Sequence, residues 1–139
     1  MLHLTEFLAH ELPLTGLAFQ ASSAETVTYH DPCRLGGLAG IYEPPRQLLE
    51  LLPETRLGEM ERTRENALCC GTSASMECSS YSKAIQNERL QEAIQTGART
   101  LITACPKCQI HFTCAKSDTD VHLKVIDLYT YLKERLSVN

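Results

Sequence analysis

The sequence lacks several features that would place it in common functional classes. It has no run of Lys and Arg of the kind that binds phosphate backbones, and its net charge is −4, so we expect no nucleic-acid partner. No apolar run approaches the roughly 18 residues of a membrane helix, which predicts that there is no transmembrane segment. The glycine-rich fingerprint of a dinucleotide site is also missing, so a flavin or nicotinamide site would have to lie on a partner.

Cysteine is too sparse for a disulfide scaffold. The seven cysteines make up about 5% of the chain, below the roughly 8–10% that is typical of such scaffolds. Their number is odd, and no Lys or Arg precedes Arg34, so the charged start of a signal peptide is absent. These features predict a cytoplasmic protein with reduced thiols, in which clustered cysteines indicate metal or redox chemistry.

The length and the composition suit one globular domain preceded by a short helix. The chain has 139 residues, of which 43% are hydrophobic and 22% are charged. Residues 2–12 have the pattern of an amphipathic helix, with Thr5 as a candidate cap. We therefore expect an N-terminal helix and connector over residues 1–24 and a cysteine-rich domain over residues 25–139.

Short apolar runs alternate with helical patterns along the rest of the chain. The expected strands cover residues 26–30, 56–61, 100–104 and 121–126. The expected helices cover residues 44–52, 81–96 and 108–115 and a final segment that Asp127 caps and that buries Leu128, Tyr129, Leu132 and Leu136. The apolar residues expected on the buried face of the helix over 81–96 are Tyr81, Ala84, Ile85, Ala93 and Ile94, with Gly97 as its cap. This order predicts a single α/β domain with a mainly parallel β-sheet flanked by helices.

Five of the cysteines form three groups that are spaced almost evenly. They follow the pattern C-x35-C-C-x34-C-x2-C and are Cys33, Cys69, Cys70, Cys105 and Cys108. The loops that follow parallel strands all emerge at the carboxyl edge of the sheet. We therefore expect the cysteine loops to meet at that edge.

The number of thiols favours a cluster of several metal ions. The spacing of Cys105 and Cys108 suits a single metal centre, whereas Cys69 and Cys70 are adjacent and would more naturally meet two irons, with Gly71 allowing the sharp bend. Five thiolates are one more than a zinc site or a cubane [4Fe–4S] cluster takes from protein. The alternatives are zinc and, for some of the thiols, burial as small hydrophobic side chains.

The cysteine motifs resemble the cysteine-rich CCG domain of the heterodisulfide reductase catalytic subunit. Similar domains occur in iron–sulfur subunits of glycolate and lactate oxidation systems. The stretches that carry the resemblance are Tyr29-His30-Asp31-Pro32-Cys33, Asn66-Ala67-Leu68-Cys69-Cys70-Gly71 and Thr103-Ala104-Cys105-Pro106-Lys107-Cys108. The resemblance implies that Cys33, Cys69, Cys70, Cys105 and Cys108 bind the cofactor. That cofactor is a [4Fe–4S] cluster, noncubane in the catalytic subunit, with zinc in some relatives as the alternative.

The same resemblance implies a subunit of an oxidoreductase that acts on a disulfide/thiol or 2-hydroxy acid system. In the catalytic subunit the clusters split a disulfide between two thiol coenzymes in one-electron steps. The implied partners are other redox subunits, iron–sulfur or flavin-containing, and a second CCG domain or copy, because the family motif usually occurs twice and occurs once here. The alternatives are a non-catalytic electron-transfer subunit and a structural zinc-binding assembly module. The sequence assigns no catalytic residue, and residues 72–76 differ from the glycines of many relatives.

Other polar residues have simpler interpretations. Cys78 and Cys114 are expected to be structural thiols, and His111 to have no role at the cluster. Lys107 either offsets the charge of the anionic site or is solvated. His30 is expected to pack beneath its turn, with a hydrogen bond to a cluster sulfur or the supply of a proton as the alternatives, and Asp31 is expected to cap the loop. The charged residues of segment 59–65 are expected to be exposed and to have no further role: Glu59, Glu61, Arg62, Arg64 and Glu65.

Overall fold

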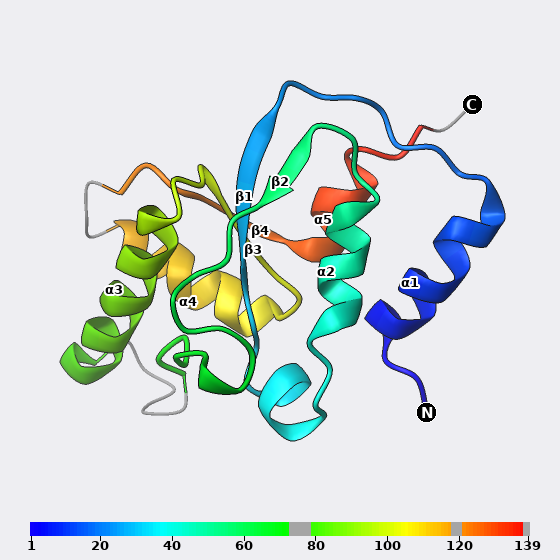
Figure 1. Cartoon of the computed structure of the whole chain (residues 1–139). Helices are drawn as coiled ribbons and strands as arrows, with labels where there is room; N and C mark the ends of the chain where they lie inside the picture. Colours follow the sequence, from blue (N-terminus) through cyan, green and yellow to red (C-terminus); the bar gives the residue numbers. More distant parts are fainter. Residues whose placement is uncertain (73–78, 118–120, 138–139) are drawn as a thin grey trace.

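A parallel sheet lies at the centre of the molecule. A computed structural model describes residues 1–72, 79–117 and 121–137. Within these residues one sheet contains four parallel strands in the order β2-β1-β3-β4 (Figure 1). The strands are β1 (Glu25–His30), β2 (Thr55–Leu57), β3 (Thr100–Thr103) and β4 (Lys124–Asp127). The predicted α/β domain with a mainly parallel sheet is confirmed.

Three of the strands end level with one another at the carboxyl edge. His30 of β1 pairs with Thr103 of β3, and Thr103 pairs with Asp127 of β4. Strand β2 pairs only with the first half of β1, and the chain then runs through a 3-10 turn, η2 (Arg64–Asn66), before it reaches the vicinal cysteines. The loops that carry Cys33 and Cys105 therefore leave from the same edge of the sheet, as the strand order predicted.

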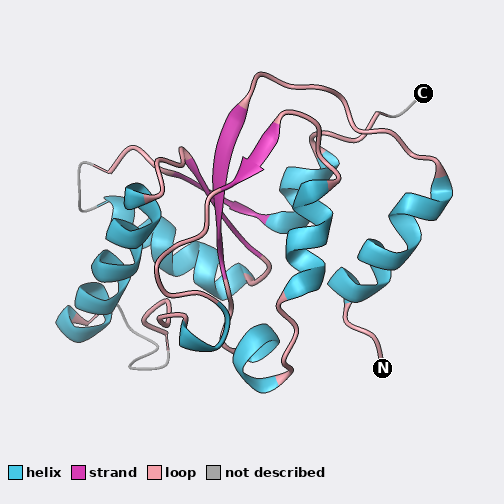
Figure 2. Ribbon diagram, in the orientation of Figure 1, coloured by secondary structure: helices cyan, strands magenta, loops and turns pink. Residues whose placement is uncertain are grey.

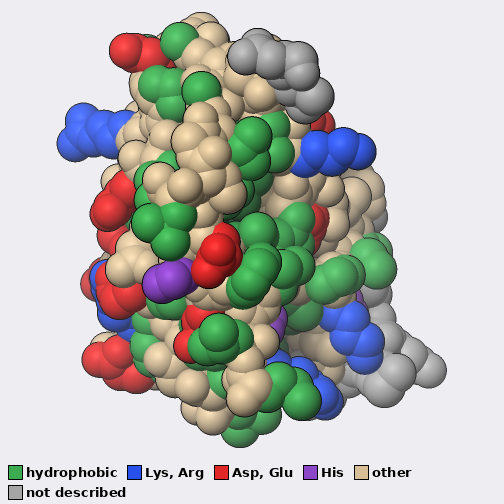
Figure 3. Space-filling model, turned by 90° about the vertical axis from the view of Figure 1, so that its right-hand side faces the viewer, with side chains coloured by type: hydrophobic (Ala, Val, Ile, Leu, Met, Phe, Trp, Pro, Cys, Tyr) green, Lys and Arg blue, Asp and Glu red, His purple; other side chains and the backbone are tan. Residues whose placement is uncertain are grey.

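Helices cover both faces of the sheet. Helices α2 (Glu43–Glu50) and α5 (Leu128–Lys133) pack on one face, and α3 (Ser80–Gln95) and α4 (Pro106–Ser117) lie on the other (Figure 1, Figure 2). Helix α1 (Leu4–Thr15) lies outside α2, and the face of the molecule on its side carries exposed hydrophobic side chains, among them Leu4, Phe7, Leu14 and Leu17 (Figure 3). Within the described residues, no helix combines the length and the apolar character that crossing a bilayer requires.

The alternation of side chains along β1 divides the core into two clusters. Val27 and Tyr29 belong to the cluster beneath α2 and α5. His30, one residue further on, contacts the ring of Phe112, which belongs to the cluster beneath α3 and α4. Successive side chains of a strand point to opposite faces. The strand itself therefore directs His30 toward the layer that contains Cys70 and Cys108.

Several predicted boundaries differ from the structure. The cap of α1 is His3 and not Thr5, because the His3 ring accepts from the Thr5 N–H while Glu6 accepts from the His3 N–H, which forms a capping box. Strand β2 ends at Leu57, short of the predicted residue 61, and the N–H of Gly58 donates the last bond of the ladder to the carbonyl of Val27. Strand β4 begins only at Lys124, and α4 begins at Pro106, before the predicted residue 108.

The end of the chain follows the prediction more closely. Asp127 caps α5 as expected, accepting from the N–H groups of Tyr129 and Thr130. Leu128 and Leu132 are buried as predicted. Tyr129 and Leu136, which were also expected to be buried, are only partly buried, and Tyr131 is fully buried instead. The short helix α5 ends at Lys133, so Leu136 lies beyond the face that packs on the sheet.

The predicted buried face of α3 is wrong except at Ala93, which is buried as expected. Tyr81 is 80% exposed and Ile94 is 39% exposed. The buried side of the helix instead carries mostly polar residues: Ser82, Gln86, Arg89, Leu90, Glu92 and Ala93. The expectation failed because this helix packs its polar side against the cysteine loop and against His30, where the partners are hydrogen-bonding groups. Gly97 does follow the last turn with a φ of 77°, as predicted.

The expectation that segment 59–65 has no role is also wrong. The buried guanidinium of Arg46 forms a bidentate ion pair with Asp31, with nitrogen–oxygen distances of 2.8 and 2.9 Å. It forms a second bidentate pair with Glu59, at 2.6 and 3.1 Å. The N–H of Arg64 donates to Asp31 at 2.8 Å. Arg62 pairs with carboxylates of α3. Asp31 thus joins the loop before Cys33 to the segment that leads to the vicinal cysteines.

Candidate metal centre at the carboxyl edge

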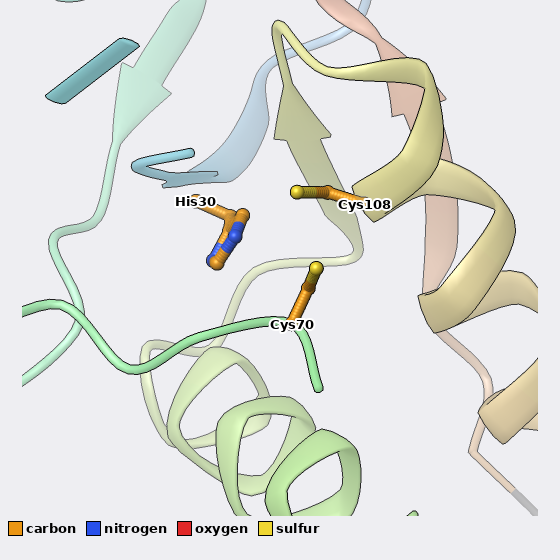
Figure 4. Close-up of side chains that lie close together, drawn as sticks. All are labelled: His30, Cys70 and Cys108. Atoms are coloured by element: carbon orange, nitrogen blue, oxygen red, sulfur yellow. The ribbon is translucent and has the colours of Figure 1, made fainter. Parts of the chain in front are cut away.

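The three cysteine groups come together at the carboxyl edge of the sheet. Cys70 and Cys108 are buried in one apolar cluster, and Cys69 and Cys105 are partly buried against that cluster. A ring nitrogen of His30 and the sulfurs of Cys70 and Cys108 lie within 4.8 Å of one another (Figure 4). Figure 4 shows these side chains converging from the end of β1, from the loop before α3 and from the start of α4.

Cys33 lies at the exposed rim of the same site. It is the residue before the π-helical turn η1 (Arg34–Leu38), and its side chain is exposed. Partial burial and the charges of Cys69 and Cys70 raise the pKa of the Cys33 thiol, while the N–H of Arg34 lowers it. Cys33 is therefore close enough to the vicinal pair to interact with it electrostatically, although about 35 residues of sequence separate them.

The start of α4 provides hydrogen bonds for sulfur. Cys105 immediately precedes Pro106, which suits the first position of a helix because it needs no N–H there. Hydrogen bonds from the Cys108 thiol and from the N–H groups of Cys108 and Lys107 lower the pKa of Cys105 to about 6, although burial opposes them. The free N–H groups of a helix start favour an anion in this way.

Neighbouring hydrogen-bond donors favour the anionic form of Cys70. Hydrogen bonds from the Cys108 thiol and from Thr72, together with the nearby His30 ring, lower the pKa of Cys70, against the effect of burial, and its sulfur lies 3.0 Å from the Thr72 hydroxyl. The pKa of Cys108 is raised, because its thiol donates to Cys105 and Cys70. These shifts favour the thiolate form of Cys70 and Cys105 and the thiol form of Cys108, and thiolates are the form in which cysteine binds metal ions.

Gly71 allows the vicinal cysteines to approach α3 closely. Its φ is 86°, and a Cβ at this position would lie 2.7 Å from the backbone oxygen of Ser82. The Ser82 hydroxyl donates to the Gly71 carbonyl at 3.0 Å. Only glycine combines this left-handed conformation with the absence of a side chain. The turn after Cys70 is therefore fixed directly to the first turns of α3.

Behind the sulfurs lies a buried polar group that the sequence did not reveal. The Nε of Arg89 donates to the Nδ1 of His30 at 3.2 Å, and both residues are fully buried. Burial, together with the charge of Arg89, lowers the pKa of His30, while Cys70 opposes this. A polar stripe at helical spacing, Ser82, Gln86 and Arg89, was the available signal, and it was missed because only the apolar residues were used to choose the buried face.

The remaining candidate residues lie outside this group. His111 is buried on α4, and its Nδ1 lies 2.9 Å from the amide nitrogen of Gln86. Lys107 is exposed, and Cys114 is partly buried further along α4. Cys78 and residues 73–76 of the segment that follows Gly71 lie outside the described residues.

A cavity opens beside the cysteine edge. Its volume is about 490 Å³, and it lies between the start of α1 and the loops of the site. Its lining includes Cys105 and Pro106 from one cysteine loop and Pro32 and Arg34, the two neighbours of Cys33, from another. A small molecule in this cavity would therefore lie next to the rim of the sulfur site.

Sequence comparison agrees with this architecture. Residues 27–113 match the family described as the cysteine-rich domain, CCG. This match covers well over half of the chain and includes all three cysteine groups, so the chain belongs to the CCG family. The resemblance expected from the cysteine motifs is confirmed.

Several curated proteins are similar to this chain. One subunit of the dihydromethanophenazine:CoB–CoM heterodisulfide reductase of Methanosarcina acetivorans is 30% identical over 141 residues, which cover 100% of this chain and 34% of that protein. The probable iron–sulfur-binding oxidoreductase FadF of Bacillus subtilis is 36% identical over 109 residues, covering 76% of this chain and 15% of FadF. One subunit of the fumarate reductase (CoM/CoB) of Methanothermobacter marburgensis is 30% identical over 87 residues, 61% of this chain and 17% of that protein. The chain thus spans about a third or less of the length of these relatives.

Proposed function

We propose that this chain is the cluster-binding part of an iron–sulfur redox subunit of the heterodisulfide reductase type. It would hold one [4Fe–4S] cluster, of the noncubane kind, through Cys33, Cys69, Cys70, Cys105 and Cys108. The observation that carries the proposal is the convergence of cysteines from three distant loops, four of them in or against one buried cluster and Cys33 at its rim. The names of the relatives, which include a heterodisulfide reductase and an iron–sulfur-binding oxidoreductase, support it.

The residues present fit such a cofactor. Iron–sulfur clusters are held by thiolates and are tuned by hydrogen bonds to their sulfurs and by solvent exposure. Backbone N–H groups already donate to the sulfurs of Cys33, Cys70 and Cys105. The fifth thiol exceeds the four ligands of a structural zinc site, so the donor set favours a cluster of several irons over zinc.

When bound, the cluster would supply and accept single electrons. The chain's own residues would then keep its inner side dry, since Cys70 and Cys108 are buried among apolar side chains such as Leu101 and Phe112. They would leave the outer side accessible where Cys33 is exposed and where the cavity meets Cys105. This difference between the two sides favours a site that a substrate can reach over one that only relays electrons.

The chemical class of substrate that suits this edge is a disulfide. Reduction of a disulfide takes two electrons and two protons and yields two thiols, and a partner redox protein would supply the electrons. The length of the relatives supports a further part of the same protein or a separate partner chain next to this domain, because the chain matches only 34% of the heterodisulfide reductase relative. We expect the partners to be iron–sulfur or flavin-containing subunits, or a second CCG domain.

A series of cysteine variants tests the ligand set. Each of the five proposed ligands is changed to serine, and the iron and acid-labile sulfide bound per chain are measured after anaerobic reconstitution. We expect each substitution to lower the iron content or to change the electron paramagnetic resonance (EPR) spectrum, with the largest loss for the buried Cys70 and Cys108. Cys114→Ser is the matched control and should bind as much iron as the unchanged protein. Equal retention of iron in Cys70→Ser and Cys114→Ser would refute the proposed ligand set.

A further inference from the structure

We propose that His30 donates a hydrogen bond to the sulfur of Cys70 and is not itself a metal ligand, and that Arg89 fixes it in this role. The inference rests on the proposed function for the identity of the cofactor, but the assignment of the imidazole proton rests on the protein alone. The assignment of this proton is important because a buried histidine beside two cysteines could otherwise be interpreted as a third ligand of a metal ion.

The proton on His30 is assigned by its contact with Arg89. A guanidinium has donors only and cannot accept a hydrogen bond. Since the Nε of Arg89 donates to the Nδ1 of His30 at 3.2 Å, Nδ1 must be an acceptor and therefore carries no proton. The ring proton of a neutral imidazole then lies on Nε2.

The surroundings of Nε2 leave sulfur as its partner. The His30 side chain is fully buried, and within the described residues Nε2 makes no hydrogen bond of ordinary geometry, to sulfur included. With Nδ1 facing Arg89, Nε2 is the nitrogen that faces the sulfurs of Cys70 and Cys108, in the group whose atoms lie within 4.8 Å (Figure 4). A buried donor is costly unless it is satisfied, and an anionic sulfur is the available acceptor.

The same contact argues against metal binding by His30. A histidine that binds a metal through one nitrogen normally donates the other N–H to a carboxylate or a carbonyl. Here the second nitrogen faces a donor, so Nε2 would have to lose the only proton of the ring before it could bind a metal. The five cysteines, moreover, already provide enough ligands for one cluster.

Arg89 is held firmly enough to impose this arrangement. Its Nη1 donates to the Arg62 carbonyl at 2.6 Å and to the carboxylate of Glu92. Glu92 in turn pairs with Arg62, which also reaches the exposed Glu88. On the other side, the ring of Phe112 packs against the His30 ring edge to face, with centroids 4.8 Å apart. Both the position and the orientation of the imidazole are therefore determined by neighbours on β1, α3 and α4.

The expected consequence is a higher reduction potential of the cluster. A hydrogen bond to a cluster-bound sulfur stabilises the added negative charge of the reduced state. Removing the donor should lower the potential while the iron remains bound. His30 is thus a positioning and tuning residue in this account, and it acts through Cys70.

The proton assignment is tested first on the metal-free, reduced protein. Nitrogen NMR of protein labelled with ¹⁵N-histidine distinguishes a protonated from an unprotonated ring nitrogen. We expect the Nε2–H form for His30 in the unchanged protein, and a loss of this preference in Arg89→Met, with Arg99→Met as an exposed control. A proton on Nδ1 of the unchanged protein would overturn the inference. This result does not depend on any cofactor.

The second test uses reconstituted protein and three variants. His30→Gln can place an amide N–H near the position of Nε2, His30→Met cannot donate, and His10→Gln is an exposed control on α1. We expect all three to bind as much iron and sulfide as the unchanged protein, and His30→Met alone to show a lower reduction potential. Loss of iron in both His30 variants but not in His10→Gln would show that His30 is a ligand, and an unchanged potential in His30→Met would show that it is no donor.

The two proposals can fail separately. If the unchanged protein binds no iron, the proposed function fails, while the NMR experiment still decides the state of His30. If His30→Met does not fold, His30→Gln and the NMR experiment still test the inference. Loss of iron in His30→Gln, or a proton on Nδ1 in the unchanged protein, contradicts it. Retention of iron in His30→Gln together with the Nε2–H form supports it.

Discussion

Replacing Gly71 by alanine should destabilise the protein more than a left-handed backbone position alone explains. At a φ of 86°, an alanine incurs about 1–2 kcal/mol for the left-handed conformation. Its Cβ would also lie 2.7 Å from the Ser82 backbone oxygen and 2.9 Å from the Ser82 hydroxyl. Such overpacking costs about 1–3 kcal/mol, because a helix backbone cannot move away cheaply. We therefore expect a total loss of roughly 2–5 kcal/mol in the free energy of unfolding.

The chain contains a matched control for this experiment. Gly97 has a similar φ of 77°, but a Cβ there would meet no atom within 4 Å. Gly97→Ala should therefore lose only the backbone contribution, about 1–2 kcal/mol. Urea unfolding of the reduced, metal-free variants measures both values, and the difference of about 1–3 kcal/mol isolates the contact with α3. Equal destabilisation of the two variants would refute the claim that the vicinal cysteine turn is packed tightly on Ser82.

Three further substitutions test the supports of the site by the same unfolding experiment. Arg46→Met should lose about 3–5 kcal/mol, since it leaves the buried carboxylate of Asp31 without its cation, whereas the exposed Arg56→Met should change stability by less than about 0.5 kcal/mol. Ser82→Ala should lose about 1–3 kcal/mol, because the Gly71 carbonyl loses its donor; a change near zero would contradict this. Asp127→Ala should lose about 1 kcal/mol with its helix cap, and unaltered stability would show that the cap is redundant.

The sheet and the meeting of the cysteine loops could be predicted because they depend on short-range patterns. The run from Thr26 to His30 and the run from Thr100 to Thr103 are β-rich and are bounded by turn residues, so they were recognised as strands. Alternation with helices then required a parallel sheet, and a parallel sheet places the following loops at one edge. Strand β2 was placed less well, because its three residues carry little pattern of their own.

The polar interior of the site could not be predicted from the same patterns. Periodicity rules assign apolar residues to the buried face of a helix. On α3 that assumption chose Tyr81 and Ile94, which are exposed, and passed over Arg89, which is fully buried. Burial of Arg89 is possible only because Glu92 and His30 are both in reach, and that arrangement depends on contacts between residues far apart in the sequence.

The role of segment 59–65 was missed for a related reason. A run of mixed charges normally indicates an exposed, solvated stretch. Here Glu59 pairs with the buried Arg46, and the backbone N–H of Arg64 donates to Asp31, so the segment is tied to the loop that carries Cys33. The sequence shows the charges but not the distant partners with which they pair.

The metal content of protein purified without exposure to air tests the central claim most directly. Iron, acid-labile sulfide and zinc are measured per chain, and EPR spectra are recorded for the oxidised and the reduced forms. The proposed function predicts about four iron and four sulfide per chain, together with a paramagnetic signal in one of the two redox states. One zinc ion per chain, with no iron and no paramagnetic signal, would contradict it.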